Sequence, residues 1–264
     1  MIGVLEIGIE GIGVWSPELA NWDTANSMFC GNLAKPIDQA TRPAATILPP
    51  NERRRAPEAV LLALEAAQQA CAMAQRDPTD LPNVFASAYG DLVINDYMCS
   101  TLATAPLDIS PTRFHNSVHN APAGYWAIAA KCMRASTAMS AGAATFGAGL
   151  LEATLLALDT QGAVLYVASD VAAVGPLKDA ISSRTAFAVA FVLAPPSANA
   201  CARLRLKITR PGLASAASVP QAANGGNPIA DSLPLLRHLA QRKAGELTIA
   251  AGPELNLCME THFD

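Results

Sequence analysis

The chain alternates between short apolar runs and longer stretches in which apolar residues recur at helical spacing. Residues 5–16 begin with apolar alternation broken by Gly8, Gly11 and Gly13. This predicts a strand whose backbone passes close to another element. A long helix is predicted from Pro57 onward, with an apolar stripe formed by Val60, Leu61, Leu64, Cys71 and Ala74.

Further strands are predicted from the apolar runs that follow. Residues 84–90 read as a short strand with a glycine exit, and residues 163–168 and 187–193 are continuous apolar runs. Such runs are typical of strands that are buried on both faces of a sheet. Because strands alternate with helices, we expect a mostly parallel sheet in an α/β/α layering.

The remaining segments predict a long loop and a short closing unit. Residues 20–56, rich in Asn, Pro and Thr, predict a loop. The closing unit is predicted to hold a half-exposed edge strand at 203–209, a loop at 224–228, a helix at 233–242 capped by Asp231 or Ser232, and a final strand at 246–251. A length of 264 residues suits one large domain, and we expect residues 1–264 to form it.

Composition restricts the class of protein. Apolar residues make up 51% of the chain and charged residues 15%, which predicts a large core and an extensive buried interface. The longest apolar run, residues 186–194, is too short to span a membrane, and no basic-then-apolar leader opens the chain. The net charge of −4, with no basic stripe, argues against nucleic-acid binding. We therefore expect a cytoplasmic protein.

The six cysteines show no metal-binding or disulfide spacing. They stand at positions 30, 71, 99, 132, 201 and 258, without a Cys-x-x-Cys pair. Reduced, mostly buried thiols are the expectation, with no zinc site and no disulfide framework.

Residues 136–152 form the most informative stretch, with seven alanines and glycines between Ala141 and Gly149. Each glycine inside a helix costs about 1 kcal/mol relative to alanine, so close packing must favour these residues. The pattern predicts a strand end that turns sharply into a tightly packed helix. Taken alone, Met139 in this stretch is compatible with an ordinary core methionine.

Residues 108–125 form a second specific stretch. His115 and His119 are four residues apart, as are Asn116 and Asn120, and on one helix each pair would share a face. A metal site would need a third ligand, and the neighbouring sequence offers none. We therefore predict no metal here.

The stretch at 136–152 resembles the nucleophile turn of the β-ketoacyl synthases, which have the thiolase fold. In those enzymes a Ser/Thr-Ala-Cys sequence presents a cysteine at the start of a buried helix, whereas Ser136-Thr137-Ala138 is followed here by Met139. A helix amino terminus lowers the pKa of a cysteine and supplies a thiolate. A thioether has no proton to lose and cannot form the acyl thioester.

The stretch at 108–125 resembles a segment of the synthases of aryl polyene-type pathways and of their partner subunits. There it lies at the subunit interface and reaches towards the acyl pocket. The family's two catalytic histidine contexts have no counterpart in this sequence. The resemblance implies these interface or acyl-tunnel candidates: Phe114, His115, Ser117, Val118, His119, Asn120, Thr137, Met139 and Phe146.

Together these resemblances imply a thiolase-like α/β/α fold, with one N-terminal-type half and a short C-terminal remnant. The implied function is that of a non-catalytic chain length factor of the aryl polyene type. It would pair with a full-length β-ketoacyl-ACP synthase, meet the acyl carrier protein through that complex, and use no cofactor.

Two other functions stay open at this stage. A free-standing acyl-transfer enzyme would use Ser136, Thr137 or Ser140 as acyl acceptor and His115 or His119 as base. A homodimeric carrier-binding module would never meet a synthase. The arginines at 53–55 fit contact with an acidic carrier protein or a solvated approach to the next helix.

Overall fold

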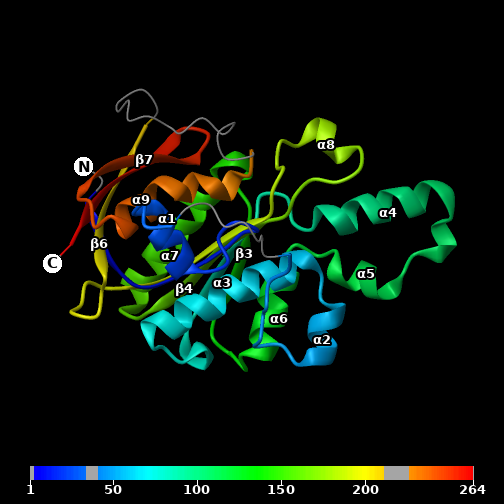
Figure 1. The fold of residues 1–264 in the computed structure, drawn as a ribbon, viewed down its shortest axis with the longest axis horizontal. Helices are drawn as coiled ribbons and strands as arrows, with labels where there is room; N and C mark the ends of the chain where they lie inside the picture. The colour runs from blue at the N-terminus through cyan, green and yellow to red at the C-terminus, as the bar shows by residue number, and fades with distance from the viewer. Residues whose placement is uncertain (1–2, 34–40, 211–225, 264) are drawn as a thin grey trace.

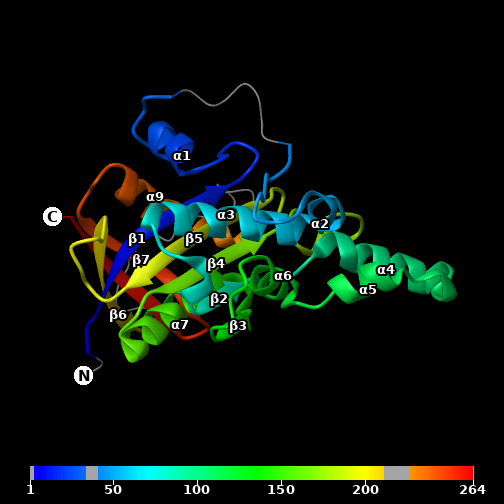
Figure 2. The same cartoon turned by 90° about the horizontal axis from the view of Figure 1, so that it is seen from below.

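Eight strands form one mixed sheet in the order β3-β2-β4-β5-β1-β6-β8-β7 (Figures 1 and 2). The computed structural model describes residues 3–33, 41–210 and 226–263. The strands are β1 (Leu5–Trp15), β2 (Asn83–Ala86), β3 (Ser136–Met139), β4 (Val164–Asp170), β5 (Phe187–Ala194), β6 (Ala202–Thr209), β7 (Gly245–Gly252) and β8 (Leu255–His262).

The prediction of a mostly parallel sheet is wrong. The only parallel pairings among the described strands are those of β2 with β3 and of β2 with β4. The other five described pairings are antiparallel. An apolar run shows that a strand is buried on both faces, but it carries no information on the direction of the neighbouring strand.

Helices cover both faces of the sheet, as the α/β/α prediction requires (Figure 2). The described α-helices are α1 (Trp22–Phe29), α2 (Pro50–Arg55), α3 (Glu58–Ala74), α4 (Leu92–Thr104), α5 (Pro111–Asn116), α6 (Ala121–Ala129), α7 (Thr145–Thr160), α8 (Leu177–Ala180) and α9 (Leu233–Ala240). One apolar cluster lies between the sheet and α3 with α6. The other lies between the sheet and α1, α7 and α9.

The glycines of β1 explain how the long helix α3 approaches the sheet. A Cβ at Gly11 would overlap the carbonyl oxygen of Ala70, and one at Gly13 would overlap that of Ala66. The prediction that this strand passes close to another element is confirmed, and that element is α3.

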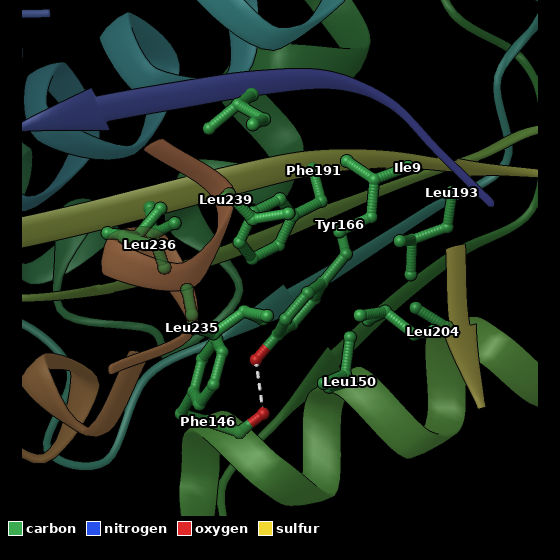
Figure 3. Close-up of a cluster of buried hydrophobic side chains, with 14 of the residues drawn as sticks. Ile9, Phe146, Leu150, Tyr166, Phe191, Leu193, Leu204, Leu235, Leu236 and Leu239 are labelled. Atoms are coloured by element: carbon green, nitrogen blue, oxygen red, sulfur yellow. Dashed lines mark hydrogen bonds between the residues drawn. The ribbon is translucent and has the colours of Figure 1, made fainter. Parts of the chain in front are cut away.

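The second cluster centres on Tyr166 of β4, which is fully buried (Figure 3). Its hydroxyl donates a 2.6 Å hydrogen bond to the carbonyl oxygen of Phe146 in α7. The Phe146 ring lies 6.0 Å from the Tyr166 ring, centroid to centroid. A Cβ at Gly149 would lie only 2.6 Å from the Tyr166 ring, so the small residues of α7 do serve close packing.

Residues 20–56 are not the continuous loop that was predicted, because α1 and α2 lie within them. Asn21 caps α1 by accepting a hydrogen bond from the backbone N–H of Thr24 at 2.8 Å. Pro50 occupies the first turn of α2, where a missing N–H is tolerated. Both helices are one or two turns long, too short for their periodicity to stand out.

The closing unit also departs from the sequence-based expectation. β6 has the predicted alternation, but it lies between β1 and β8 and is not an edge strand. β7 is not the final strand, since residues 253–254 form a tight turn into β8. Helix α9 is confirmed and begins after Ser232. The first residues of the predicted loop at 224–228 lie outside the described part of the chain.

Helices α4 and α5 project from the body at one end of the molecule (Figures 1 and 2). Both follow β2, so this arm starts at the carboxyl end of a parallel strand. Among the described helices, none combines the length and apolar composition needed to cross a bilayer.

All six cysteines are free thiols, but the expectation that most are buried is wrong. Cys71 and Cys132 are buried, whereas Cys30 and Cys99 are exposed. Burial raises the pKa of the Cys71 thiol to about 12.

Candidate functional site

The candidate site lies where the parallel strands β2, β3 and β4 end side by side. The carboxyl ends of parallel strands share one edge of a sheet, and ligand sites of α/β proteins concentrate there. A turn at residues 87–90 follows β2. Its Ser87 N–H donates a 3.1 Å hydrogen bond to the carbonyl oxygen of Met139. The Ser140 hydroxyl donates a 3.1 Å bond to the carbonyl oxygen of Ala88.

Asp170, the last residue of β4, anchors this turn. Its carboxylate is 1% exposed and accepts hydrogen bonds from the Ser87 hydroxyl at 2.7 Å, the Ala88 N–H at 2.9 Å and the Tyr89 N–H at 3.1 Å. Burial raises the pKa of Asp170 to about 6, against the opposing effects of these bonds and of the nearby His119. One buried carboxylate therefore holds three residues of the turn to the end of β4.

The stretch at 108–125 reaches the same turn. It forms two short helices, α5 and α6, separated by residues 117–120, so the predicted sharing of one helix face by His115 and His119 is wrong. His119 Nε2 lies 2.9 Å from the carbonyl oxygen of Ser87. Because a carbonyl oxygen only accepts, Nε2 carries the proton in this bond.

A groove of about 470 Å³ lies beside the turn, between α2, α5 and α6. Its lining includes His115, Val118, Asn120, Gly124, Tyr125 and Ile128. The structure therefore brings three of the predicted site residues together in one groove, and Ile128, missed by the sequence analysis, adds an apolar side chain that is 76% exposed.

The other predicted site residues lie apart from the groove. Phe114 is exposed on α5, and the Ser117 hydroxyl donates a 2.8 Å bond to the carbonyl oxygen of Phe114. Thr137 is half-buried in β3. Phe146 is buried in the core of α7.

Met139 ends β3 and is half-buried against the cluster that contains Phe146. The strand does not turn directly into the helix, as the sequence suggested. A 3-10 turn at Gly142–Ala144 intervenes, and α7 begins only at Thr145. The Thr145 hydroxyl accepts a 2.9 Å bond from the Ala141 N–H and donates a 2.7 Å bond to the Gly142 carbonyl oxygen.

The structure does not pair a base with any of the candidate acyl acceptors. The Ser136 hydroxyl donates to Asn83 Oδ1 at 2.6 Å, and that of Ser140 donates to the turn. Within the described ranges, no hydrogen bond joins His115 or His119 to these hydroxyls or to Thr137. No group of three or more His, Cys, Asp or Glu residues is placed to hold a metal ion in that same part of the chain.

Sequence reasoning missed Asp170 and the role of Ser87. The only signal for Asp170 was its place at the end of a strand in which every residue is buried. A carboxylate in that position has to find donors, since an unpaired buried charge is very unfavourable.

Comparison with known proteins shows which family the chain matches. The profile described as "Beta-ketoacyl synthase, N-terminal domain" matches residues 22–253. No match was found among curated protein sequences.

Several solved structures share the fold. One is the ketosynthase ApeO in complex with its chain length factor ApeC from Xenorhabdus doucetiae, with a TM-score of 0.71, 23% identity, and 97% of this chain and 99% of that chain covered. The ishigamide ketosynthase/chain length factor has a TM-score of 0.73, 13% identity and the same coverage. AntDE:AntF, a ketosynthase with its acyl carrier protein, has a TM-score of 0.74, 10% identity and full coverage of both chains.

Proposed function

Because the chain belongs to the β-ketoacyl synthase family through its N-terminal domain, we propose that it is a non-catalytic chain length factor. It pairs with a full-length β-ketoacyl-ACP synthase and forms part of the wall of that enzyme's acyl tunnel. The products belong to the aryl polyene or polyketide class, built by fatty acid-like chemistry, and the acyl carrier protein is met through the complex.

The proposal rests mainly on Met139, which stands where the synthase nucleophile turn that residues 136–139 resemble has its cysteine. The strand ends, the turn at 87–90 and Asp170 are hydrogen-bonded around it, yet the side chain is a thioether. Acyl transfer in this family needs a thiolate. A chain that keeps the fold without the nucleophile acts through its shape.

The open edge of β3 supports pairing with another subunit. β3 pairs only with β2 among the described strands, and so lies at the end of the sheet. The carbonyl oxygen of Ala135 accepts a bond from Asn83 of β2, and that of Met139 accepts one from Ser87, the residue after β2. The backbone N–H groups of successive residues in a strand point to opposite edges. The N–H of Ala138 therefore points to the open edge, where a partner strand can accept its hydrogen bond.

Exposed apolar side chains near this edge also support pairing with another subunit there. Ile128 of α6 is 76% exposed, and Met133, which precedes β3, is 95% exposed. Phe114 and Val118 are also exposed apolar residues of the 108–125 stretch. Apolar side chains that gather beside an open strand edge mark an interaction surface.

The tunnel wall is assigned on this proposal to the groove between α2, α5 and α6. His115, Val118 and Asn120 line it. Met139, outside the groove lining, takes on this proposal the place of the synthase cysteine. Met139 packs against the apolar cluster that contains Phe146.

The test is the native mass of the chain alone and after co-expression with the full-length synthase encoded nearest to it. We expect a one-to-one complex for the wild type and for Ala138→Val, which keeps its N–H. Ala138→Pro removes the outward N–H without removing a bond to β2, and we expect the complex to be lost while the chain still folds.

Two outcomes contradict the proposed function, and a third contradicts only the proposed mode of assembly. A wild-type chain that remains a homodimer and ignores the synthase would favour the carrier-binding module. Acylation of a serine by an activated ester would favour the free-standing enzyme. Normal assembly of Ala138→Pro would exclude β3 pairing as the mode of assembly.

A further inference from the structure

We infer that Asp170 is the positioning residue of the partner-binding face: its ionised carboxylate holds the turn at 87–90, and assembly with the synthase weakens when that charge is lost. The inference rests on the proposed function. It adds a regulatory group that touches neither the synthase nor the acyl chain.

The turn at 87–90 is the common support of three segments of that face. It is bonded to the end of β3 through the Met139 carbonyl oxygen and the Ser140 hydroxyl. It is bonded to the 117–120 connection through His119. It also leads directly into α4, where Asp91 caps the helix by accepting a 2.8 Å bond from the Ile94 N–H.

Asp170 fastens this support to the sheet. β4 lies between β2 and β5, and all its residues are buried, which makes it a rigid base. The carboxylate takes the Ser87 hydroxyl and the N–H groups of Ala88 and Tyr89, while the Ser87 hydroxyl in turn accepts a 2.9 Å bond from the Gly90 N–H. Asp170 thus bonds three consecutive residues directly and the fourth, Gly90, through Ser87.

Loss of the charge changes the number of bonds that the carboxyl can accept. An ionised carboxylate is acceptor-only, whereas a protonated one carries an O–H donor on one of its oxygens. The donors of the turn converge on both oxygens, so protonation adds an O–H to one of them and removes the charge that strengthens all three bonds. The turn is then held less firmly, and so are the end of β3 and His119, which are bonded to it.

The charge changes within an ordinary pH range. The pKa of Asp170 is about 6 because burial opposes ionisation. Two titratable groups face it, His119 from the 117–120 connection and Tyr89 from the turn. β5 places Phe187 opposite it, and Asn227 donates to its backbone carbonyl oxygen at 3.0 Å. Neither of these two side chains titrates.

Asp231 provides a matched control. Burial also raises its pKa to about 6, and it lies in the 3-10 turn Pro228–Ser232, which packs against β4. Its carboxylate makes no described hydrogen bond to the turn at 87–90. A pH effect that arises from any aspartate with a raised pKa would therefore follow Asp231 as well as Asp170.

The experiment measures the dissociation constant of the complex with the full-length synthase at about pH 7.5 and about pH 5, which bracket the titration. Binding that requires the ionised form weakens as pH falls. For the wild type we expect roughly tenfold weaker binding at the lower pH, because a neutral carboxyl is a weaker hydrogen-bond acceptor than a charged one. Asp170→Asn should bind weakly at both pH values, and Asp231→Asn should behave as the wild type.

Hydrogen exchange of the isolated chain separates this inference from the proposed function. At a single pH, we expect Asp170→Asn, but not Asp231→Asn, to exchange faster at residues 87–90 and 136–140. A wild type that never binds the synthase contradicts the proposed function only, and the exchange result then decides the inference. Unchanged exchange in Asp170→Asn, or a pH dependence of binding that persists in it, overturns the inference.

Discussion

At the scale of single residues, the main difference from the synthase nucleophile turn that residues 136–139 resemble is the thioether of Met139. Met139 lies at the end of β3, and its carbonyl oxygen is bonded to Ser87. Its thioether is half-buried against the core. Reactivity of a cysteine at this position would need a helix amino terminus or a base close by. α7 begins six residues later, and His119 is engaged with the Ser87 carbonyl oxygen.

Met139→Cys is therefore expected not to restore acyl transfer. The introduced thiol would lack both a base and the donors that stabilise the condensing enolate. Intact mass after incubation with acyl carrier protein loaded with an acyl chain checks this. The wild type is the control for the six native thiols. An acyl adduct confined to the Met139→Cys variant would show that the site retains catalytic capacity.

At the scale of elements, glycines in two helices have different physical roles. In α7, a Cβ at Gly147 would overlap the carbonyl oxygen of Ala250 in β7, so the glycine lets helix and strand approach. In α6, a Cβ at Gly124 would meet no described atom within 4 Å. Nothing in the described chain uses the space at Gly124, and that residue lines the groove of the candidate site.

The two glycines form a matched pair for stability measurements. Gly147→Ala should destabilise the isolated chain by about 1–3 kcal/mol, since the helix or the strand must move. Gly124→Ala should stabilise it by about 0.5–1 kcal/mol, because alanine is the better helix former and finds open space. Urea denaturation of both variants provides the comparison. Equal losses of stability would mean that Gly124 is packed within the chain.

At the scale of the whole molecule, exposed apolar side chains and a terminal strand lie on the β3 side of the sheet. The arm of α4 and α5 projects at one end of the molecule (Figure 1), and the open edge of β3 lies beside exposed Ile128 and Met133. The opposite end of the sheet is formed by the β7–β8 hairpin, in which β7 is the last strand. Apolar surface of this kind favours association when no partner is present.

The isolated chain is therefore expected to self-associate as its concentration rises. Added synthase should convert these species into a one-to-one complex, because the same apolar surface cannot serve both contacts. Native mass across a concentration series, with and without the synthase, measures this. Ile128→Lys is the informative variant and should reduce both kinds of association. A chain that stays monomeric throughout the series would contradict the expectation.

Much of the architecture follows from local patterns in the sequence. The strand at 5–16, the helix after Pro57 and the buried strands at 163–168 and 187–193 are all confirmed, within a few residues. Their apolar spacing reflects burial on one face or two, which depends on near neighbours in the chain. The absence of a thiol at Met139 is likewise visible from the sequence.

Strand direction, the interior position of β6 and the hydrogen bonds of Asp170 were decided only by the tertiary structure. β6 alternates as an edge strand would, and only pairing with β8 places it inside the sheet. Asp170 and Ser87 are 83 positions apart in the chain, and parallel pairing of β2 with β4 brings them within 2.7 Å. Periodicity encodes which face of an element is buried. Which elements meet depends on the lowest free energy of the whole packed chain, and no local pattern contains that.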